Sequence, residues 1–166
     1  MSFKRAFVIL ALLLSLTACG FQPLYSKNNA KGDFDQIAIA NIPDRSGQYL
    51  RNLLMDRFYT QGRPSNPRYT LEVTNLKEDS IDLDITKTSS STRAQLRMDA
   101  TITLRDNATQ AVLLEQPLLA ITSYDILSSQ FTTRVSEQST RENALHDLAR
   151  QIEMRLALYL RTQQIP

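Results

Sequence analysis

Hydrophobic and polar residues alternate most regularly in the middle of the chain. Between residues 94 and 104 every second residue is apolar, and the residues between them are Gln, Arg, Asp or Thr. The apolar set is Ala94, Leu96, Met98, Ala100, Ile102 and Leu104. Because successive side chains of a strand point to opposite faces, this pattern predicts a strand with one core face and one solvated face.

The segments before it also have the character of strands. Residues 36–42 form a short apolar run that Pro43 ends, which indicates a strand buried on both faces. The two-residue period appears in residues 69–73 and again in residues 81–85. Both segments are therefore predicted to be half-buried strands.

A turn and one more strand are predicted after residue 104. Asp106 and Asn107 are residues that favour turns. Residues 112–121 then return as a further strand, interrupted by Pro117. A proline has no N–H to donate to a sheet, so this strand is expected at an edge or with a bulge.

Two segments have the helical period. Ser46 is expected to cap the first helix, and Gly62 to follow its end. The apolar stripe of that helix consists of Leu50, Leu53, Leu54 and Phe58. Ser139 and Glu142 form a capping box that predicts a second helix over residues 140–162. Its apolar positions are Leu145, Leu148, Ala149, Ile152, Leu156 and Tyr159.

This order of elements predicts an α+β fold. We expect a two-layer sandwich in which two helices pack on one face of a four-stranded, mostly antiparallel sheet. Residues 36–166 are expected to form this single domain. The polar segment 19–35, which contains proline, glycine, asparagine and lysine, is expected to be a tether.

The first 18 residues have the pattern of a signal peptide. Lys4 and Arg5 precede an apolar run at residues 6–16, which is about half the roughly 20 residues that a membrane-spanning helix needs. The run leads to Leu-Thr-Ala-Cys, and Cys19 is the single cysteine of the chain. This ending resembles the lipobox of bacterial lipoproteins, which implies cleavage before Cys19 and acylation of its sulfur and amine. The alternative is an ordinary secretory signal with an incidental cysteine.

The charge and chemistry of the chain favour no catalytic class. Cleavage removes two of the 19 basic residues and leaves 17 against 17 acidic ones, so there is no electrostatic case for a nucleic-acid partner. His146 is the single histidine, which leaves too few ligands for a zinc site or a catalytic triad. Asp82 and Asp84 alternate with apolar residues and are expected on the solvent face of a strand. We therefore predict no enzyme activity, no metal and no cofactor other than the covalent lipid.

Two polar segments are candidates for binding. The segment from residue 86 to 97 contains Lys87, Arg93 and Arg97 beside a run of serines, and is expected to be a hairpin tip. It is either a solvated tip or a contact for a phosphorylated glycolipid or the polar wall of a barrel. Residues 124–134 combine aromatic and hydroxyl side chains, and either pack or form a contact surface.

Several motifs resemble one bacterial family. The opening Cys-Gly-Phe-Gln-Pro-Leu-Tyr of residues 19–25 resembles that of the LPS-assembly lipoprotein family LptE in its alphaproteobacterial form. Ser123-Tyr124-Asp125, followed by Ser-x-Phe at residues 129–131, and the helix of residues 141–156 resemble the same family more loosely. The resemblance covers most of the mature chain and implies two helices on a four-stranded sheet.

The resemblance also implies a function and partners. Members of the family sit inside the outer-membrane barrel protein LptD, assist its assembly and help to deliver lipopolysaccharide to the outer leaflet. Gly20 follows the cysteine, where an Asp is associated with inner-membrane retention, so we expect the outer membrane. The competing interpretations are an auxiliary lipoprotein of a phospholipid-transport system and an anchored periplasmic hydrolase.

Replacement of the lipobox cysteine tests the anchoring. Cys19→Ala is expected to abolish acylation and to leave an unlipidated precursor, because no other thiol is present. Metabolic labelling with palmitate measures this directly. Incorporation of label into the Cys19→Ala protein would show that the lipoprotein interpretation is wrong.

Overall fold

The computed structural model describes residues 34–59, 62–85, 91–127 and 129–163. Its elements follow one another as β1 (Ile37–Ile39), α3 (Asp44–Phe58), β2 (Tyr69–Ile85), β3 (Ser91–Asp106), β4 (Val112–Asp125) and α4 (Gln130–Gln163). The predicted signal peptide, Cys19 and most of the tether lie outside the described residues. Within the described residues, no helix is both long and apolar enough to cross a membrane.

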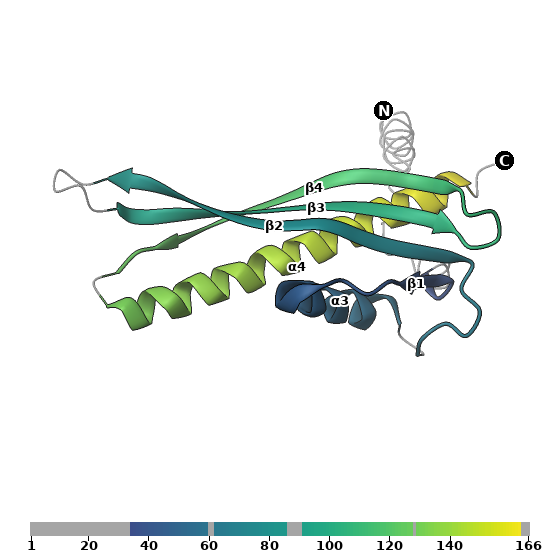
Figure 1. The fold of residues 1–166 in the computed structure, drawn as a ribbon, viewed down its shortest axis with the longest axis horizontal. Helices are drawn as coiled ribbons and strands as arrows, with labels where there is room; N and C mark the ends of the chain where they lie inside the picture. Colours follow the sequence, from purple (N-terminus) through teal and green to yellow (C-terminus); the bar gives the residue numbers. More distant parts are fainter. Residues whose placement is uncertain (1–33, 60–61, 86–90, 128, 164–166) are drawn as a thin grey trace, which may run out of the picture.

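The four strands form one mixed sheet in the order β1-β2-β3-β4. β1 pairs parallel to β2, and the other two pairings are antiparallel. Figure 1 shows long, twisted strands with α3 and α4 beneath them, and α4 running along most of their length. The predicted α+β fold, with two helices packed against a four-stranded sheet, is confirmed.

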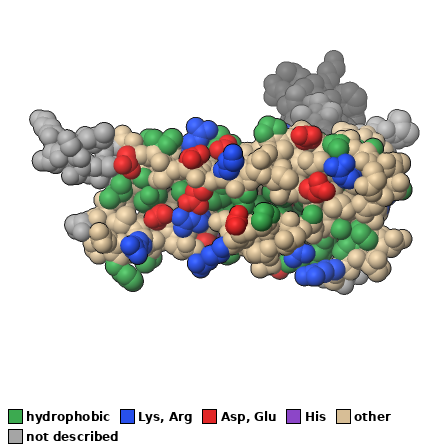
Figure 2. All heavy atoms as spheres, viewed as in Figure 1, with side chains coloured by type: hydrophobic (Ala, Val, Ile, Leu, Met, Phe, Trp, Pro, Cys, Tyr) green, Lys and Arg blue, Asp and Glu red, His purple; other side chains and the backbone are tan. Residues whose placement is uncertain are grey.

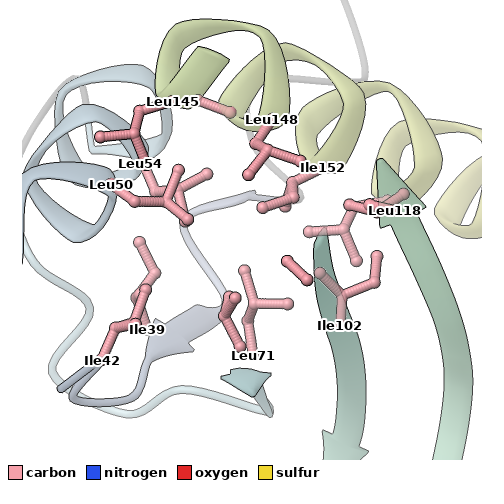
Figure 3. Close-up of a cluster of buried hydrophobic side chains, with 14 of the residues drawn as sticks. Ile39, Ile42, Leu50, Leu54, Leu71, Ile102, Leu118, Leu145, Leu148 and Ile152 are labelled. Carbon is pink, nitrogen blue, oxygen red and sulfur yellow. The ribbon is translucent and has the colours of Figure 1, made fainter. Parts of the chain in front are cut away.

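The core lies between the helices and the inner face of the sheet. All six alternating apolar residues of β3 are buried, at 2% exposure or less. Leu71 and Val73 of β2 lie opposite Leu104 and Ile102, so the same face of both strands is apolar. In Figure 3, helix residues such as Leu50 and Leu148 point toward Leu71, Ile102 and Leu118. Both predicted helical stripes are therefore on the core side.

The core begins earlier in the chain than predicted. Phe34 is buried, and its ring is stacked on that of Phe58 with 4.5 Å between the ring centroids. The core therefore begins two residues before the predicted start of the domain.

The start of α3 differs from the prediction. The helix begins at Asp44, after Pro43 at the N-cap position, and no side chain caps it. Ser46, the predicted cap, lies in the first turn of the helix. This turn packs closely on the end of the β1 segment, since a Cβ at Gly47 would come within 2.7 Å of Ile42. The acidic Asp44 in the first turn is favourable at the positive end of the helix dipole.

The start of α4 also differs from the prediction. The helix begins at Gln130, so the predicted capping box at Ser139 and Glu142 lies in its interior. There Glu142 accepts a hydrogen bond from the Gln138 side chain instead. Ser129 serves the helix start, since its hydroxyl accepts a hydrogen bond from the N–H of Thr132. The helix gains three turns by beginning almost where β4 ends.

One continuous strand, β2, replaces the two short strands predicted for residues 69–73 and 81–85. Thr74 lies opposite Thr101, whereas Lys77 lies opposite Asp99. Two residues of β2 therefore face one of β3, which is a β-bulge. Asn75, the first of the two, has a positive φ of 53°.

The bulge reverses which side chains face the core. Beyond it, Ser80 and Asp82 lie opposite Leu96 and Ala94, on the helix side of the sheet. Ile81 and Leu83 are instead 44% and 49% exposed. The predicted core side for this apolar pair is therefore wrong. Asp82 is exposed, as predicted, although it lies on the helix side of the sheet, and the side chain of Asp84 is not described.

The predictions for the other edge of the sheet are confirmed. β4 is an edge strand, and Pro117 lies within it opposite Thr101. The turn before it is at Asp106, whose carboxylate accepts hydrogen bonds from the N–H groups of Ala108 and Thr109 at 2.9 Å. These bonds, that from Thr109 first, lower the pKa of Asp106.

Two neighbouring substitutions test the phase of β3. Ile102→Asp places a charge at a site with no exposure and is expected to cost about 4 kcal/mol of unfolding free energy or more. Thr101→Asp, on the opposite face, is expected to cost about 1 kcal/mol or less. Urea denaturation of both variants measures the difference. Equal losses would contradict the assigned phase.

Candidate functional site: the distal end of the sheet

The three long strands extend beyond α3, and we call this part of the molecule the distal end. It consists of residues 77–85 of β2, residues 91–99 of β3, residues 119–125 of β4 and the first turns of α4 (Figure 1). The helices cover one face of the sheet. The other face, which we call the open face, carries the odd-numbered residues of β3, because the even-numbered ones are buried.

The structure places two of the three predicted cations, Arg93 and Arg97, at separate positions along β3. Lys87 lies outside the described residues. Arg93 is exposed, and its Nε is 3.5 Å from a carboxylate oxygen of Asp125, itself exposed. Such an exposed pair contributes little to stability. Arg97 is four residues, or about 13 Å, further along the same face of β3.

Arg97 has a mixed environment on the open face. Asp79 of β2 is its register partner on one side, and Ile121 of β4 on the other. In the next row toward the core, Asp99 lies between Lys77 and Leu119. Charged residues on β2 and β3 therefore adjoin an apolar edge on β4.

The apolar part of the open face is missing from the sequence prediction. Leu119 and Ile121 are 38% and 49% exposed, while Leu118 and Ala120, which precede them, are buried. Residues 118–121 are all apolar, and this break in the alternation is the signal that the strand has apolar side chains on both faces.

The segment 124–134 divides between packing and exposure. Tyr124 is half-buried, and its hydroxyl lies 3.3 Å from that of Ser80. Phe131 is 77% exposed, and Val135, one turn later on α4, is 53% exposed. Residues four apart share a helix face. The two side chains therefore form a small apolar surface beside the strand tips.

Arg141 ties α4 to β2 where the distal end begins. Its guanidinium donates two hydrogen bonds to Glu78, at 2.6 and 2.7 Å, and one to Glu137 at 2.8 Å. The bonds to Glu78, followed by that to Glu137, raise the pKa of Arg141. Glu78 lies on the helix side only because of the bulge, so the periodicity of the sequence did not predict this ion pair with Arg141.

The described residues contain no group of three or more His, Cys, Asp or Glu side chains able to hold a metal ion. His146 is half-buried at the boundary of the helices, with Nε2 3.4 Å from the hydroxyl of Tyr49. On the face shown in Figure 2, charged and apolar side chains are intermingled.

The chain matches one protein family over most of its length. The profile described as "LptE: Lipopolysaccharide-assembly" matches residues 34–156. No curated protein matches the chain.

Several solved structures have a similar fold. A lipoprotein from Caulobacter crescentus is 24% identical, with a TM-score of 0.67, over 81% of this chain and 96% of that chain. A minor lipoprotein from Acinetobacter baumannii is 20% identical, with a TM-score of 0.60, over 75% and 94%. Rare lipoprotein B from Shewanella oneidensis is 8% identical, with a TM-score of 0.61, over 78% and 97%. At these identities the likeness establishes the fold.

Proposed function

Because the chain belongs to the LptE lipopolysaccharide-assembly family, we propose that it is an outer-membrane lipoprotein that plugs the barrel protein LptD. In this role it assists the assembly of LptD and takes part in lipopolysaccharide transport to the outer leaflet. The role is one of binding, without catalysis and without a cofactor other than the lipid on Cys19.

The observation that carries the proposal is the composition of the open face. The lumen of a large barrel is polar and wet, so a plug needs a surface of hydrogen-bonding groups with limited apolar contact. The open face provides these as rows of opposite charges on β2 and β3 beside Leu119 and Ile121. The equal numbers of acidic and basic residues after cleavage also suit insertion without strong repulsion.

The proposed anchor is compatible with this location. Acylation of Cys19 holds one end in the membrane, since three acyl chains exceed the two signals that stable anchoring needs. Residues 19–33 span at most about 50 Å when extended. That length exceeds the hydrocarbon thickness of about 30 Å, so the tether lets the domain reach from the inner leaflet into a barrel.

Lys87, Arg93 and Arg97 are the proposed contacts for lipopolysaccharide phosphates or for the lumen wall. Cations bind phosphates by charge-assisted hydrogen bonds. The positions of Arg93 and Arg97 about 13 Å apart favour separate anionic groups over one shared phosphate.

A triple charge reversal tests these contacts. The variant Lys87→Glu, Arg93→Glu, Arg97→Glu is expected to weaken lipopolysaccharide binding about tenfold or more, because it replaces three attractive contacts by repulsive ones. Binding to the purified protein and co-purification with LptD are both measured, after circular dichroism has shown that the variant is folded.

A matched control separates local contact from net charge. Arg45, Arg63 and Arg155 are exposed and lie outside the distal end, so reversing all three makes the same change in charge. The control is expected to retain binding. A folded distal variant that binds lipopolysaccharide and LptD as the unaltered protein does would contradict the assigned contacts.

A further inference from the structure

Among the residues that the structure describes, no strand pairs with the outer edge of β2 over most of its length. β1 pairs with β2 only at Tyr69–Leu71, whereas β2 continues to Ile85. The last backbone hydrogen bond between the two segments is donated by Ala40 to the carbonyl of Leu71. Figure 1 shows β2 extending far beyond the short β1.

The hydrogen-bonding pattern shows which backbone groups point out of this edge. The backbone N–H of Tyr69 donates a hydrogen bond to the carbonyl of Gln36 in the β1 segment. The N–H and C=O groups of every second residue of β2 up to Val73 therefore point toward the same edge. Beyond the bulge the register pairs Lys77 with Asp99, which directs the backbone of Lys77 toward β3. It follows that the N–H and C=O groups of Glu78, Ser80 and Asp82 point outward.

The same pattern accounts for the position of Pro117. Its register across β3 directs the nitrogen of Pro117 out of the opposite edge of the sheet, where no hydrogen bond is needed. The β4 edge is thus interrupted by a residue that has no N–H. Among described residues the outer edge of β2 contains no proline.

A cleft of about 650 Å³ lies where β1 leaves the edge. One wall is the segment from Ala40 to Asp44, and the other is β2 from Glu72 to Glu78. Val73, Leu76 and Met98 contribute apolar surface to it. The cleft therefore accepts an apolar side chain of a strand that continues the line of β1.

The exposed charges along this edge are mainly negative. Asp44, Asp79 and Asp82 are exposed and have no ion pair with other described residues. Lys77 is the one exposed cation of the described part of β2. Glu78 is already neutralised by Arg141. The edge as a whole thus attracts positive charge.

We propose that the outer edge of β2 binds an extended, basic segment of a partner protein by β-strand addition. The backbone of the segment pairs with Glu78, Ser80 and Asp82, an apolar side chain enters the cleft, and Lys or Arg side chains meet the free carboxylates. A second copy of this chain fits poorly, because two acidic edges placed side by side repel each other. The bulge and Lys77 restrict indiscriminate pairing at the edge.

Binding of defined peptides to the full chain, purified from membranes in detergent, tests this inference. The probe is a ten-residue peptide of alternating Arg and Val, and the comparison peptide has Glu in place of Arg. The Arg peptide is expected to bind at least about tenfold more tightly and to slow amide hydrogen exchange at Glu78, Ser80 and Asp82.

Two identical substitutions at opposite edges provide the control. Ser80→Pro removes an outward N–H of β2 and is expected to weaken binding of the Arg peptide about tenfold. Ser123→Pro removes an outward N–H of β4 and is expected to leave binding unchanged.

The inference is overturned by any of three results. These are no binding of the Arg peptide, equal binding of both peptides, or equal effects of the two proline variants. Because no barrel protein is present in the experiment, such a failure leaves the proposed role with LptD untouched.

Discussion

In the bulge of β2, Asn75 and Leu76 together lie opposite Ala100 of β3. Before this point the odd-numbered residues of β2 face the helices, and after it Glu78, Ser80 and Asp82 do. A strand that kept its first phase would direct Ile81 and Leu83 toward α4 and leave Glu78 on the open face. The inserted residue instead brings Glu78 to the helix side, where Arg141 binds its carboxylate in a bidentate pair.

The two ends of the sheet consequently differ in their packing. On the β1 side of the bulge, both helices and all four strands enclose an apolar core from Phe34 to Leu160. On the distal side, the helix layer consists of α4 alone, held by Arg141, and polar side chains such as Ser80 and Tyr124 lie between the layers. The contacts proposed above for other molecules therefore lie at the end of the sheet that a single helix covers.

Local patterns in the sequence predicted those features that depend on a single element. The six-fold alternation in β3, the stripes of both helices and the edge position of β4 each follow from a period or from one proline, and all agree with the structure. The predicted start of α4 does not agree with the structure, because the pattern at Ser139 and Glu142 also occurs inside helices. Where the helix begins depends on where β4 ends. The bulge has no signal in the sequence beyond Asn75, the residue with the positive φ. The faces on which Ile81, Asp82 and Glu78 lie could therefore be assigned only from the pairing of β2 with β3.

The candidate site was predictable in composition and not in geometry. Arg93 and Arg97 were recognisable as cations near a hairpin, but their separation along β3 follows from the length of the strand. The open edge of β2 was not visible in the sequence, since it depends on how early β1 ends.

Cross-strand nuclear Overhauser effects measure the register of β2 on β3 directly. In the antiparallel register of the structure, Glu78 lies opposite Met98, and Ser80 opposite Leu96. Both are pairs without mutual hydrogen bonds, whose Cα atoms are about 4.5 Å apart. Strong contacts between the Hα protons of Glu78 and Met98 are therefore expected. Such a contact between Lys77 and Met98 in its place would show a strand without the bulge and would contradict the account.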